Sequence, residues 1–494
     1  MELTRRDLLK GSLAAGGLLI ARQGGALAKP LGPADAYGTS RVSPLAPGYL
    51  CVHADMHNHT LFSDGDGDPV EAFVSMRDAG LDVAALTDHT TISDTLPESP
   101  CLPFALLGQG HQECQSLAGM NETTWQVTAD LAARNSVPDE FLAIRGFEWS
   151  SPTLGHMNVW FSQEFTDPLH TGGLGTADDL ALFAAGEDFP APQEVLDALQ
   201  DLVEATPAAG LGMKAWYEWL KADPSTPALG GGADGVFGFN HPGREAGRFS
   251  GFEFDQGLID RCVSLELFNR REDYLFERTD DLGIASPLVA CLDAGWRPGI
   301  LGVTDEHGTD WGFPDGKGRA GLYVTGIGPD AVREALLARR FYATNLKGLR
   351  LFATANGHAM GSSVPHQTGE VEIAIDVDRG RAWWGRELGV QILGTGSPLP
   401  TVVEATTITV PRGGQQPPTI TVCHDLADGE WLVVRITDPT LPADGRADAT
   451  YESFGGAIAY ASPFYLTPWV QVPVNFGGRR SLPAVRPSMR SSVP

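Results

Sequence analysis

Hydrophobic and polar positions predict a strand, a helix and a second strand within residues 50–89. The helix is expected over residues 68–80, because Asp68 suits a cap, Pro69 suits the first turn and Gly80 ends the pattern. The apolar run that follows, LDVAALTDH, is short and suits a buried strand. A strand, a helix and a strand in so short a segment predict parallel pairing.

Similar apolar runs recur through the first 345 residues, and several lead directly into His, Asp or Glu. They are FLAIRGFEWS, HMNVWFS, GVFGFNHPG, CVSLELFN and PGILGVTDEHG, with helical segments over 192–206 and 329–340 between or after them. This order predicts an α/β barrel over residues 50–345, with its active site at the carboxyl ends of the strands. Gly-, Pro- and acid-rich insertions over about 91–140 and 162–235 are expected to shape or cover the pocket.

After residue 345 the pattern changes to alternating strands separated by turn residues. The strands are LRLFATA, VEIAIDVD, GVQILGT, TVVEATTITV, WLVVRITD and IAYASPFYL. They predict a small antiparallel β-sandwich domain over residues 346–470. The Pro-, Ser- and Arg-rich segment over 471–494 is expected to be a disordered tail.

The first 28 residues have the form of an export signal. Arg5 and Arg6 precede a short apolar run, and Ala26-Leu27-Ala28 has the small-x-small form of a cleavage site. These features predict a twin-arginine signal peptide over 1–28 and a linker over 29–49. The mature protein is therefore expected in the periplasm or secreted, with the twin-arginine export machinery as a partner of the precursor. No other stretch reaches the roughly 18 apolar residues of a membrane span.

The net charge bears on the kinds of partner the protein binds, and the cysteine content bears on possible disulfides. The formal net charge is −27, from 62 acidic and 35 basic residues. Such a surface repels nucleic acid and anionic lipid, so a small-molecule substrate is expected. The six cysteines contain no CxxC pair. Cys101 and Cys114 are the nearest pair, but the sequence does not fix any disulfide connectivity.

Six histidines and three carboxylates follow the predicted strands of the first 345 residues. They are His57, His59, Asp64, His89, Glu148, His156, His241, Asp305 and His307. A lone histidine is more often structural, but this many at successive strand ends favour metal binding. Imidazole and carboxylate ligands without thiolate suit Zn, Mn or Fe. Nine ligands exceed what one ion takes, so two to three divalent ions are expected.

The motifs HNHTLFSDG, LTDH, GFEWS followed by GHMN, FNHPG and VTDEHG resemble those of the PHP (polymerase and histidinol phosphatase) superfamily. The resemblance covers about residues 50–345. It implies a distorted (β/α)7 barrel that holds a trinuclear metal cluster on these nine residues. The export signal, the insertions, WGFPDGKGRAGLYV and the β-sandwich resemble more narrowly the exported carbaryl-hydrolase-type branch, which includes hydrolases of carbamate esters.

The amidohydrolases are a rival family that also places HxH on a barrel. Their binuclear sites commonly use a carboxylated lysine at a strand end. The six lysines of this chain are Lys10, Lys29, Lys214, Lys221, Lys317 and Lys347, and none ends an apolar strand. The lysine pattern therefore favours the PHP resemblance.

Several residues can be given roles in such a site. Bound divalent ions lower the pKa of a water molecule and polarise the bond under attack. Glu148 is expected to bridge two metals, and Asp305 to share that role or to accept a proton from the water. Arg244 and Arg319 are candidates for binding anionic substrate oxygens. Glu266, at a strand end, is a candidate for orienting a metal ligand.

The predicted function is an exported PHP-type metal-dependent hydrolase that acts on phosphoesters. An alternative keeps the site but hydrolyses carbamate, carboxylic ester or amide bonds. A third hypothesis is a non-catalytic metal- or glycan-binding protein. An inert barrel should have lost some of its ligands, and all nine positions are filled here.

Overall fold

The computed structural model describes most of the chain: residues 39–90, 119–184, 193–242, 248–279, 283–312, 316–443, 451 and 454–468. The predicted signal peptide, residues 29–38 of the linker, the C-terminal tail and Arg244 lie outside the described residues. The expectations for these segments stay predictions.

The predicted strand–helix–strand unit is present near the start of the described chain. β1 (Leu50–Asp55) pairs in parallel with β2 (Val83–Leu86), and α3 (Pro69–Asp78) lies between them in the sequence. The Asp68 side chain accepts a hydrogen bond from the backbone N–H of Val70. This cap fixes the start of the helix where the sequence predicts it.

The sheet continues from β2, but one of its strands is reversed. β2 and the short β3 (His89–Thr90) are both parallel to β4 (Leu142–Ser151). β5 (Gly155–Trp160) is antiparallel to β4 and also to β6 (Val236–Phe239). Residues 152–154 alone join β4 to β5. A connection this short permits only antiparallel pairing, so the repeated parallel order expected of the barrel is broken at β5.

The predicted barrel is not closed within the described residues. β6 is parallel to β7 (Cys262–Asn269), which is parallel to β11 (Gly299–Val303), while β12 (Arg319–Val324) is antiparallel to β1. Among the described strands, β11 pairs with β7, and β12 pairs with β1 and β13. β12 also lies close against β11 at Gly302, where a Cβ atom would be 2.4 Å from the carbonyl oxygen of Arg319. The N-terminal part, residues 50–345, is therefore a mixed sheet with helices around it, and an isolated parallel bridge between Asn58 and Glu306 links the segments that follow β1 and β11.

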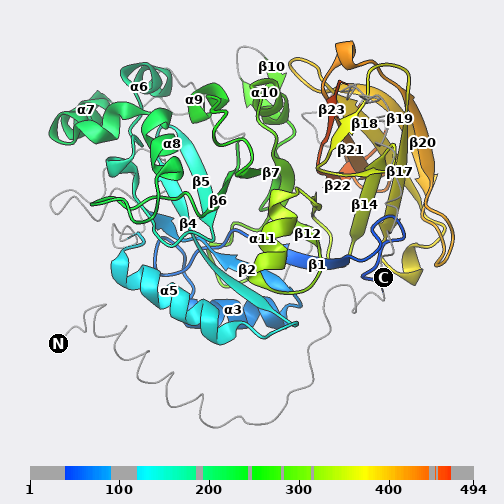
Figure 1. The fold of residues 1–494 in the computed structure, drawn as a ribbon, viewed down its shortest axis with the longest axis horizontal. Helices are drawn as coiled ribbons and strands as arrows, with labels where there is room; N and C mark the ends of the chain where they lie inside the picture. The colour runs from blue at the N-terminus through cyan, green and yellow to red at the C-terminus, as the bar shows by residue number, and fades with distance from the viewer. Residues whose placement is uncertain are drawn as a thin grey trace, which may run out of the picture.

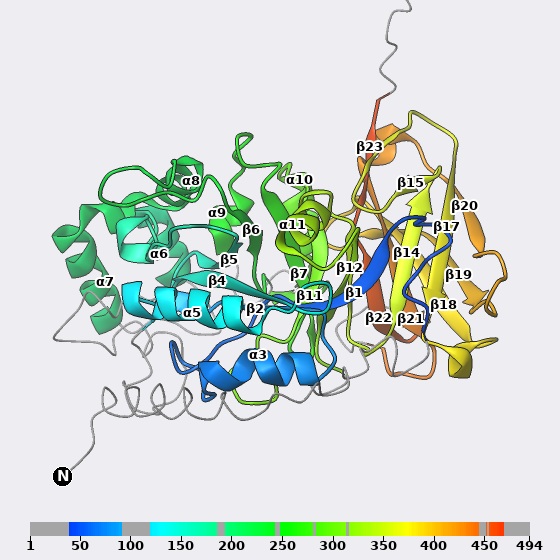
Figure 2. The same ribbon diagram turned by 60° about the horizontal axis from the view of Figure 1, so that its bottom comes forward.

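Two groups of helices cover the N-terminal part, in addition to α9 (Arg248–Phe252), α10 (Pro287–Asp293) and α11 (Pro329–Leu337) (Figure 1). α3 and α5 (Glu122–Asn135) lie side by side along one face, as Figure 2 also shows. α6 (Ala177–Ala184), α7 (Gln193–Ala205) and α8 (Met213–Lys221) gather at the end farthest from the C-terminal strands (Figure 1). α5 falls in the first predicted insertion, and the other three fall in the second.

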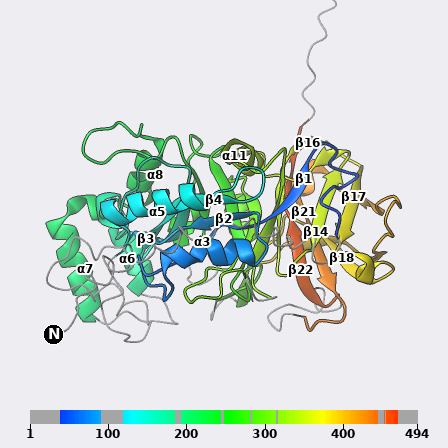
Figure 3. The same cartoon turned by 90° about the horizontal axis from the view of Figure 1, so that it is seen from below.

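The strands predicted after residue 345 are present and form two sheets (Figure 3). One contains β14 (Arg350–Ala355), β15 (His358–Ala359), β17 (Glu370–Asp378) and β20 (Thr419–Cys423). The other contains β16 (Ser363–Pro365), β18 (Glu387–Gly394), β19 (Thr401–Thr409), β21 (Trp431–Asp438), β22 (Gly456–Ala461) and β23 (Phe464–Thr467). Ile373 and Ile375 of the first sheet share a hydrophobic core with Ile392 and Val434 of the second.

The second of these sheets is continuous with the sheet of the N-terminal part. β13 (Phe341–Thr344) pairs with β12 on one side and with β22 on the other. The hydrogen-bonded ladder therefore runs across residue 345, where the sequence predicts a domain boundary. The C-terminal part, residues 346–468, is joined to the N-terminal part through backbone pairing as well as through side chains.

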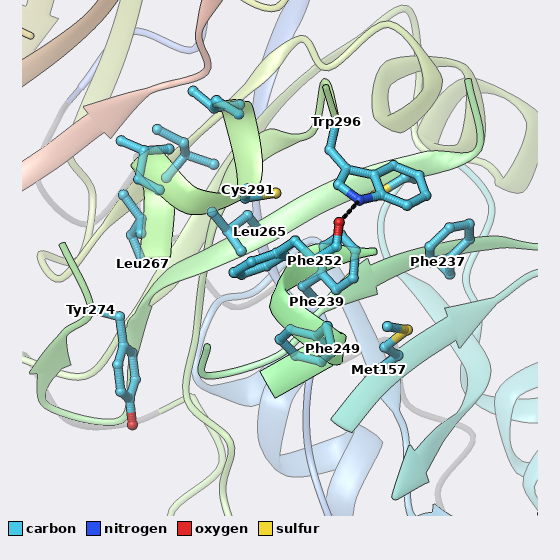
Figure 4. Close-up of a cluster of buried hydrophobic side chains, with 14 of the residues drawn as sticks. Met157, Phe237, Phe239, Phe249, Phe252, Leu265, Leu267, Tyr274, Cys291 and Trp296 are labelled. Atoms are coloured by element: carbon cyan, nitrogen blue, oxygen red, sulfur yellow. Dashed lines mark hydrogen bonds between the residues drawn. The ribbon is translucent and has the colours of Figure 1, made fainter. Parts of the chain in front are cut away.

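A large aromatic cluster lies against β6 and β7 (Figure 4). In Figure 4 the indole N–H of Trp296 donates a 3.0 Å hydrogen bond to the carbonyl oxygen of Phe252, beside Phe239. The same core includes Tyr460 and Tyr465 of the C-terminal part. The two parts thus share buried apolar surface, which stabilises their association.

Two further expectations can be compared with the described chain. Within these residues, no helix combines the length and the apolar character needed to cross a membrane. Cys51, Cys262, Cys291 and Cys423 are free cysteines. Cys101 and Cys114 lie outside the described residues.

Candidate metal centre

The structure brings all nine predicted ligands together. They come from the segment after β1 (His57, His59, Asp64), from β3 (His89), β4 (Glu148) and β5 (His156), and from the ends of β6 (His241) and β11 (Asp305, His307). Each of the nine has at least one imidazole–carboxylate contact of 3.8 Å or less with another. Local motifs far apart in sequence therefore form one cluster at one edge of the sheet.

Three overlapping groups within this cluster have donor atoms close enough to hold a metal ion. They are His59, Asp64, His89 and His307; His57, His59 and Asp305; and His89, Glu148 and His156. In each group the ligand atoms lie within 4.8 Å of one another. Since His59 and His89 each belong to two groups, the three candidate positions are neighbours.

Glu148 lies at the centre of the cluster and is fully buried. Its two carboxylate oxygens lie near different imidazoles. Oε1 is 3.3 Å from His57 Nε2, 3.3 Å from His156 Nδ1 and 3.4 Å from His241 Nε2. Oε2 is 2.6 Å from His89 Nδ1 and 3.4 Å from His59 Nε2. A carboxylate whose two oxygens point to different donor groups has the geometry needed to bridge two ions.

Groups behind the cluster orient its ligands. His57 Nδ1 donates to Glu266 Oε1 at 2.9 Å, which leaves Nε2 facing the cluster. Glu266 Oε2 also accepts 2.8 Å hydrogen bonds from the backbone N–H of His241 and from Asn269 Nδ2. One buried carboxylate thus fixes the His57 ring and the turn that carries His241. Such partners behind metal ligands raise ligand basicity and hold the tautomer.

Asp88 orders the loop that carries His59 and Asp64, a role that the sequence analysis did not assign to it. Its carboxylate accepts hydrogen bonds from the backbone N–H of Thr60 at 2.7 Å and from Ser63 Oγ at 2.7 Å. Asp88 directly precedes His89 in the motif LTDH, and this position next to a predicted ligand is the feature of the sequence that could have indicated its role. Asp55, at the end of β1, accepts hydrogen bonds from the backbone N–H and the hydroxyl of Thr304, next to Asp305.

Three residues at the same strand ends have strained backbone conformations. His241, Arg270 and Asp305 have φ values of 26°, 53° and 47°. Residues other than glycine rarely adopt positive φ, and those that do cost of order 1–3 kcal/mol each. These three residues follow the adjacent strands β6, β7 and β11, so the strain occurs where the side chains converge.

The pKa values of the imidazoles depend on the buried carboxylates. Burial alone lowers the pKa of His57, but Glu148, Glu266 and Asp305 together raise it well above its usual range. The same competition raises the pKa of His89 to about 10, with Glu148 as the strongest carboxylate partner. Without bound cations, the carboxylates therefore hold protons on neighbouring imidazoles.

The pKa values of Glu148, Asp305 and His59 are shifted downward instead. Burial opposes ionisation of Glu148 and Asp305, but the imidazoles around them hold both pKa values well below the usual range. Burial, together with the neighbouring charges of His307 and His89, lowers the pKa of His59 to about 3. His59 is thus neutral, which is the form that binds metals. Divalent cations can replace the protons on the other imidazoles.

Two buried oxygen atoms indicate that the cluster fits metal ions. Asp64 Oδ1 and Glu148 Oε2 are buried and make no hydrogen bond of good geometry within the described residues, although imidazole nitrogens lie 3.3 Å and 2.6 Å away. Poorly directed contacts compensate the burial of a carboxylate oxygen only in part, and a cation held by the same groups would complete the compensation. The donors are imidazole nitrogens and carboxylate oxygens, a set that suits Zn, Mn or Fe.

The cluster is accessible from one side. The side chain of His307 is 24% exposed and that of Asp64 is 13% exposed, whereas Glu148 and His57 are fully buried. The side chain of His156 is 12% exposed as well, so a substrate can approach the cluster at His307, Asp64 and His156, while Glu266 lies behind His57.

Of the two cations predicted to bind substrate, Arg319 alone lies within the described residues. Arg319, at the start of β12, is 1% exposed, and its charge acts on His53 and Asp55. Its role in substrate binding stays a prediction, as does that of Arg244. Arg270 is the cation that the structure brings to the cluster: its Nη2 lies 3.0 Å from His307 Nδ1 and its Nε 3.3 Å from Asp305 Oδ2. Its signal in the sequence is its position directly after the strand CVSLELFN.

Comparisons with known proteins give distant similarities. No protein-family model matches the sequence, and no curated protein matches it significantly. A two-domain protein from Bacteroides vulgatus, which contains a predicted PHP-like metal-dependent phosphoesterase, is 14% identical, with a TM-score of 0.36 over 86% of this chain and 98% of its own.

Two further solved structures are similar at a lower level. A protein from Bifidobacterium adolescentis, described as a metal-dependent phosphoesterase, is 16% identical, with a TM-score of 0.25 over 58% of this chain and 96% of its own. Endonuclease Q, bound to a 27-mer duplex with an abasic lesion, is 12% identical, with a TM-score of 0.27 over 58% of this chain and 56% of its own. Similarity at this level assigns neither a family nor an activity, so the functional argument rests on the residues of the cluster.

Proposed function

We propose that this protein is a metal-dependent hydrolase of the PHP type that acts on phosphoesters. The observation that carries the proposal is the convergence of nine imidazole and carboxylate ligands around the buried Glu148. A cluster of this size, accessible from one side, combines metal binding with access for a substrate.

The residues of the cluster divide into ligands and groups that hold them. The three groups described above would hold two to three ions of Zn, Mn or Fe. Glu148 belongs to the group with His89 and His156 and also contacts His57, His59 and His241, so it could serve a neighbouring ion as well. When bound, such ions supply the Lewis acidity that lowers the pKa of a water molecule and polarises the ester under attack. Glu266 and Asp88 keep the ligands in place from behind.

Asp305 is the proposed proton acceptor. Its Oδ1 contacts His59 Nε2 at 3.3 Å and His307 Nδ1 at 3.4 Å, while its Oδ2 lies toward Arg270. The low pKa of Asp305 keeps it ionised at neutral pH, since surrounding positive charges outweigh its burial. An ionised carboxylate beside the accessible group can accept a proton from an attacking water.

Hydrolysis of chromogenic substrates tests the proposal. Metal-loaded protein is expected to hydrolyse a p-nitrophenyl phosphate mono- or diester, and chelator-treated protein is expected to lose that activity and recover it with Mn or Zn. Activity on carboxylic esters or carbamates alone would instead support the alternative bond types and the carbaryl-hydrolase-type branch. Metal-loaded protein that hydrolyses none of these substrates would contradict a hydrolase of this kind.

The expected location and substrate size belong to the same proposal. Arg5 and Arg6 with the following apolar segment support export by the twin-arginine route to the periplasm or beyond. The net charge of −27 favours a small molecule over nucleic acid as substrate.

A further inference from the structure

Arg270 is presented to the metal ligands by a two-residue turn. β7 and β8 (Glu272–Asp273) pair antiparallel, with Asn269 opposite Glu272, so Arg270 and Arg271 form the turn between them. The carbonyl oxygen of Arg270 accepts a 2.8 Å hydrogen bond from the N–H of Gly318. The positive φ of Arg270 directs its side chain differently from that of an extended residue, and here the guanidinium reaches His307 and Asp305.

A fixed cation at this position needs an explanation. The Arg270 side chain is 40% exposed at the accessible side of the cluster. A guanidinium repels metal ions bound to Asp305 and His307, so by itself it weakens metal binding. An anionic substrate group between the ions and Arg270 reverses that effect, because the planar guanidinium donates two parallel hydrogen bonds to an oxyanion.

The C-terminal part anchors this turn through a buried polar chain. Tyr460 of β22 donates a 2.7 Å hydrogen bond from its hydroxyl to Asp273 Oδ2, and Arg435 of β21 donates from Nε to the Tyr460 hydroxyl at 3.1 Å. Tyr460 is fully buried and Arg435 is 1% exposed. The Tyr460 ring also packs on Phe268 at a centroid distance of 5.1 Å. Asp273 lies three residues after Arg270, so this chain holds the strand that ends the turn.

Arg435 is buried where the C-terminal part meets the N-terminal part. Burial of a guanidinium is unfavourable unless charge and hydrogen bonds compensate it, and apolar residues of similar size often serve stability as well or better. The chain from Arg435 through Tyr460 ends at the Asp273 carboxylate in β8, the strand that follows the turn. This chain of hydrogen bonds is therefore placed where it can hold Arg270 in position.

We propose that Arg270 binds the anionic group of the substrate, and that the C-terminal part holds Arg270 in place through Arg435, Tyr460 and Asp273. This inference rests on the proposed function, because it names the residue that recognises a phosphoester at that site. It gives the C-terminal sheets a part in substrate recognition.

The first arm of the test compares two neighbouring arginines. Arg270→Gln is expected to raise KM for p-nitrophenyl phosphate about 10- to 100-fold, the usual effect of losing a charged hydrogen bond. It should weaken inorganic phosphate binding to metal-loaded protein, measured by calorimetry, by a similar factor. Arg271→Gln, at the exposed neighbouring position, should change both values less than twofold. Metal stoichiometry at saturation should be the same in all three proteins, and Arg270→Gln should bind metal at least as tightly as wild-type protein, because a repelling charge is removed.

The second arm removes a single hydroxyl group. Tyr460→Phe keeps the ring packing and is expected to raise KM for the phosphoester and the Kd for phosphate about tenfold, with Asp273→Asn as a second variant. Tyr465→Phe is the matched control, because its buried hydroxyl also crosses to the N-terminal part but bonds to the carbonyl of Pro298. In the Arg270→Gln background, Tyr460→Phe should have no further effect if it acts through Arg270.

The outcomes separate this inference from the proposed function. Wild-type protein that hydrolyses phosphoesters while Arg270→Gln behaves like Arg271→Gln in both assays would overturn the role of Arg270 alone. Equal effects of Tyr460→Phe and Tyr465→Phe, or additive effects of Tyr460→Phe and Arg270→Gln, would overturn the role of the C-terminal part. Wild-type protein without phosphoesterase activity would contradict the proposed function, and phosphate binding would then still decide the role of Arg270.

Discussion

Replacement of Glu148 by Gln separates a bridging ligand from a structural carboxylate. Gln keeps the shape of Glu and its Oε1 can still accept the 2.6 Å hydrogen bond from Asn240 Nδ2. It loses the negative charge and the second carboxylate oxygen, which lies 2.6 Å from His89 and 3.4 Å from His59. The variant should therefore bind at least one metal equivalent fewer than wild-type protein.

The size of the effect follows from these contacts. Loss of a group that only orients a metal ligand typically costs 10- to 100-fold in metal affinity or activity. Glu148 itself contacts five imidazoles, so Glu148→Gln should lower kcat by at least about 100-fold. In metal-free protein, removing one partner of a buried ion pair should also cost about 3 kcal/mol, the lower end of the usual range.

Metal content, thermal unfolding and phosphoester hydrolysis should be measured on the same preparations. Glu334→Gln is the control, since Glu334 is 54% exposed and pairs with Arg340 outside the cluster. It should leave metal content and rate unchanged. A folded Glu148→Gln protein with wild-type metal content and rate would remove Glu148 from the site.

Three further predictions follow from the site and the sequence. Glu266→Gln should keep the metal stoichiometry but weaken metal affinity about 10- to 100-fold, because Glu266 orients His57; unchanged affinity by titration would contradict this. The folded-state pKa of His57 is raised well above its usual range, and that of His89 is raised to about 10 from an ordinary 6.5. The stabilisation that His89 gives metal-free protein is therefore fully present below pH 6.5 and is lost as pH rises toward 10, and His57 acts in the same direction. The Tm of chelated protein should therefore fall over that interval while metal-loaded protein changes less, and parallel Tm curves would refute the electrostatic account. Replacing Arg5 and Arg6 by Lys should leave the precursor in the cytoplasm in a fractionation assay, and unimpaired export would indicate another route.

The metal ligands could be predicted because each lies in a short motif at the end of an apolar run. The alternation of strand and turn in the sequence places His57, His89, Glu148 and Asp305 at strand ends, and parallel strands bring such ends together. The helix over Pro69–Asp78 was equally local, since its start depends on one capping side chain. The direction of a strand is not visible in its own apolar pattern. For β5 it could be predicted only from the short connection over 152–154, which requires β5 to run antiparallel to β4.

The environment of Arg270 could not be predicted in the same way. Its reach to His307 depends on a left-handed backbone conformation at one residue, which no neighbouring glycine or proline indicates. Its anchor involves Tyr460 and Asp273, which are 187 positions apart in the chain. The burial of Arg319 likewise depends on how β12 lies against β11. Contacts between distant segments carry no local pattern that a single sequence displays.

The most direct test of the account is the metal content of purified mature protein after chelation and reconstitution with Mn, Zn or Fe. The cluster around Glu148 predicts two to three equivalents per chain, measured by mass spectrometry of the elements after removal of loosely bound metal. Recovery of hydrolysis should follow the same titration. Less than half an equivalent bound, in protein that remains folded, would contradict the assignment of these nine residues to a metal centre.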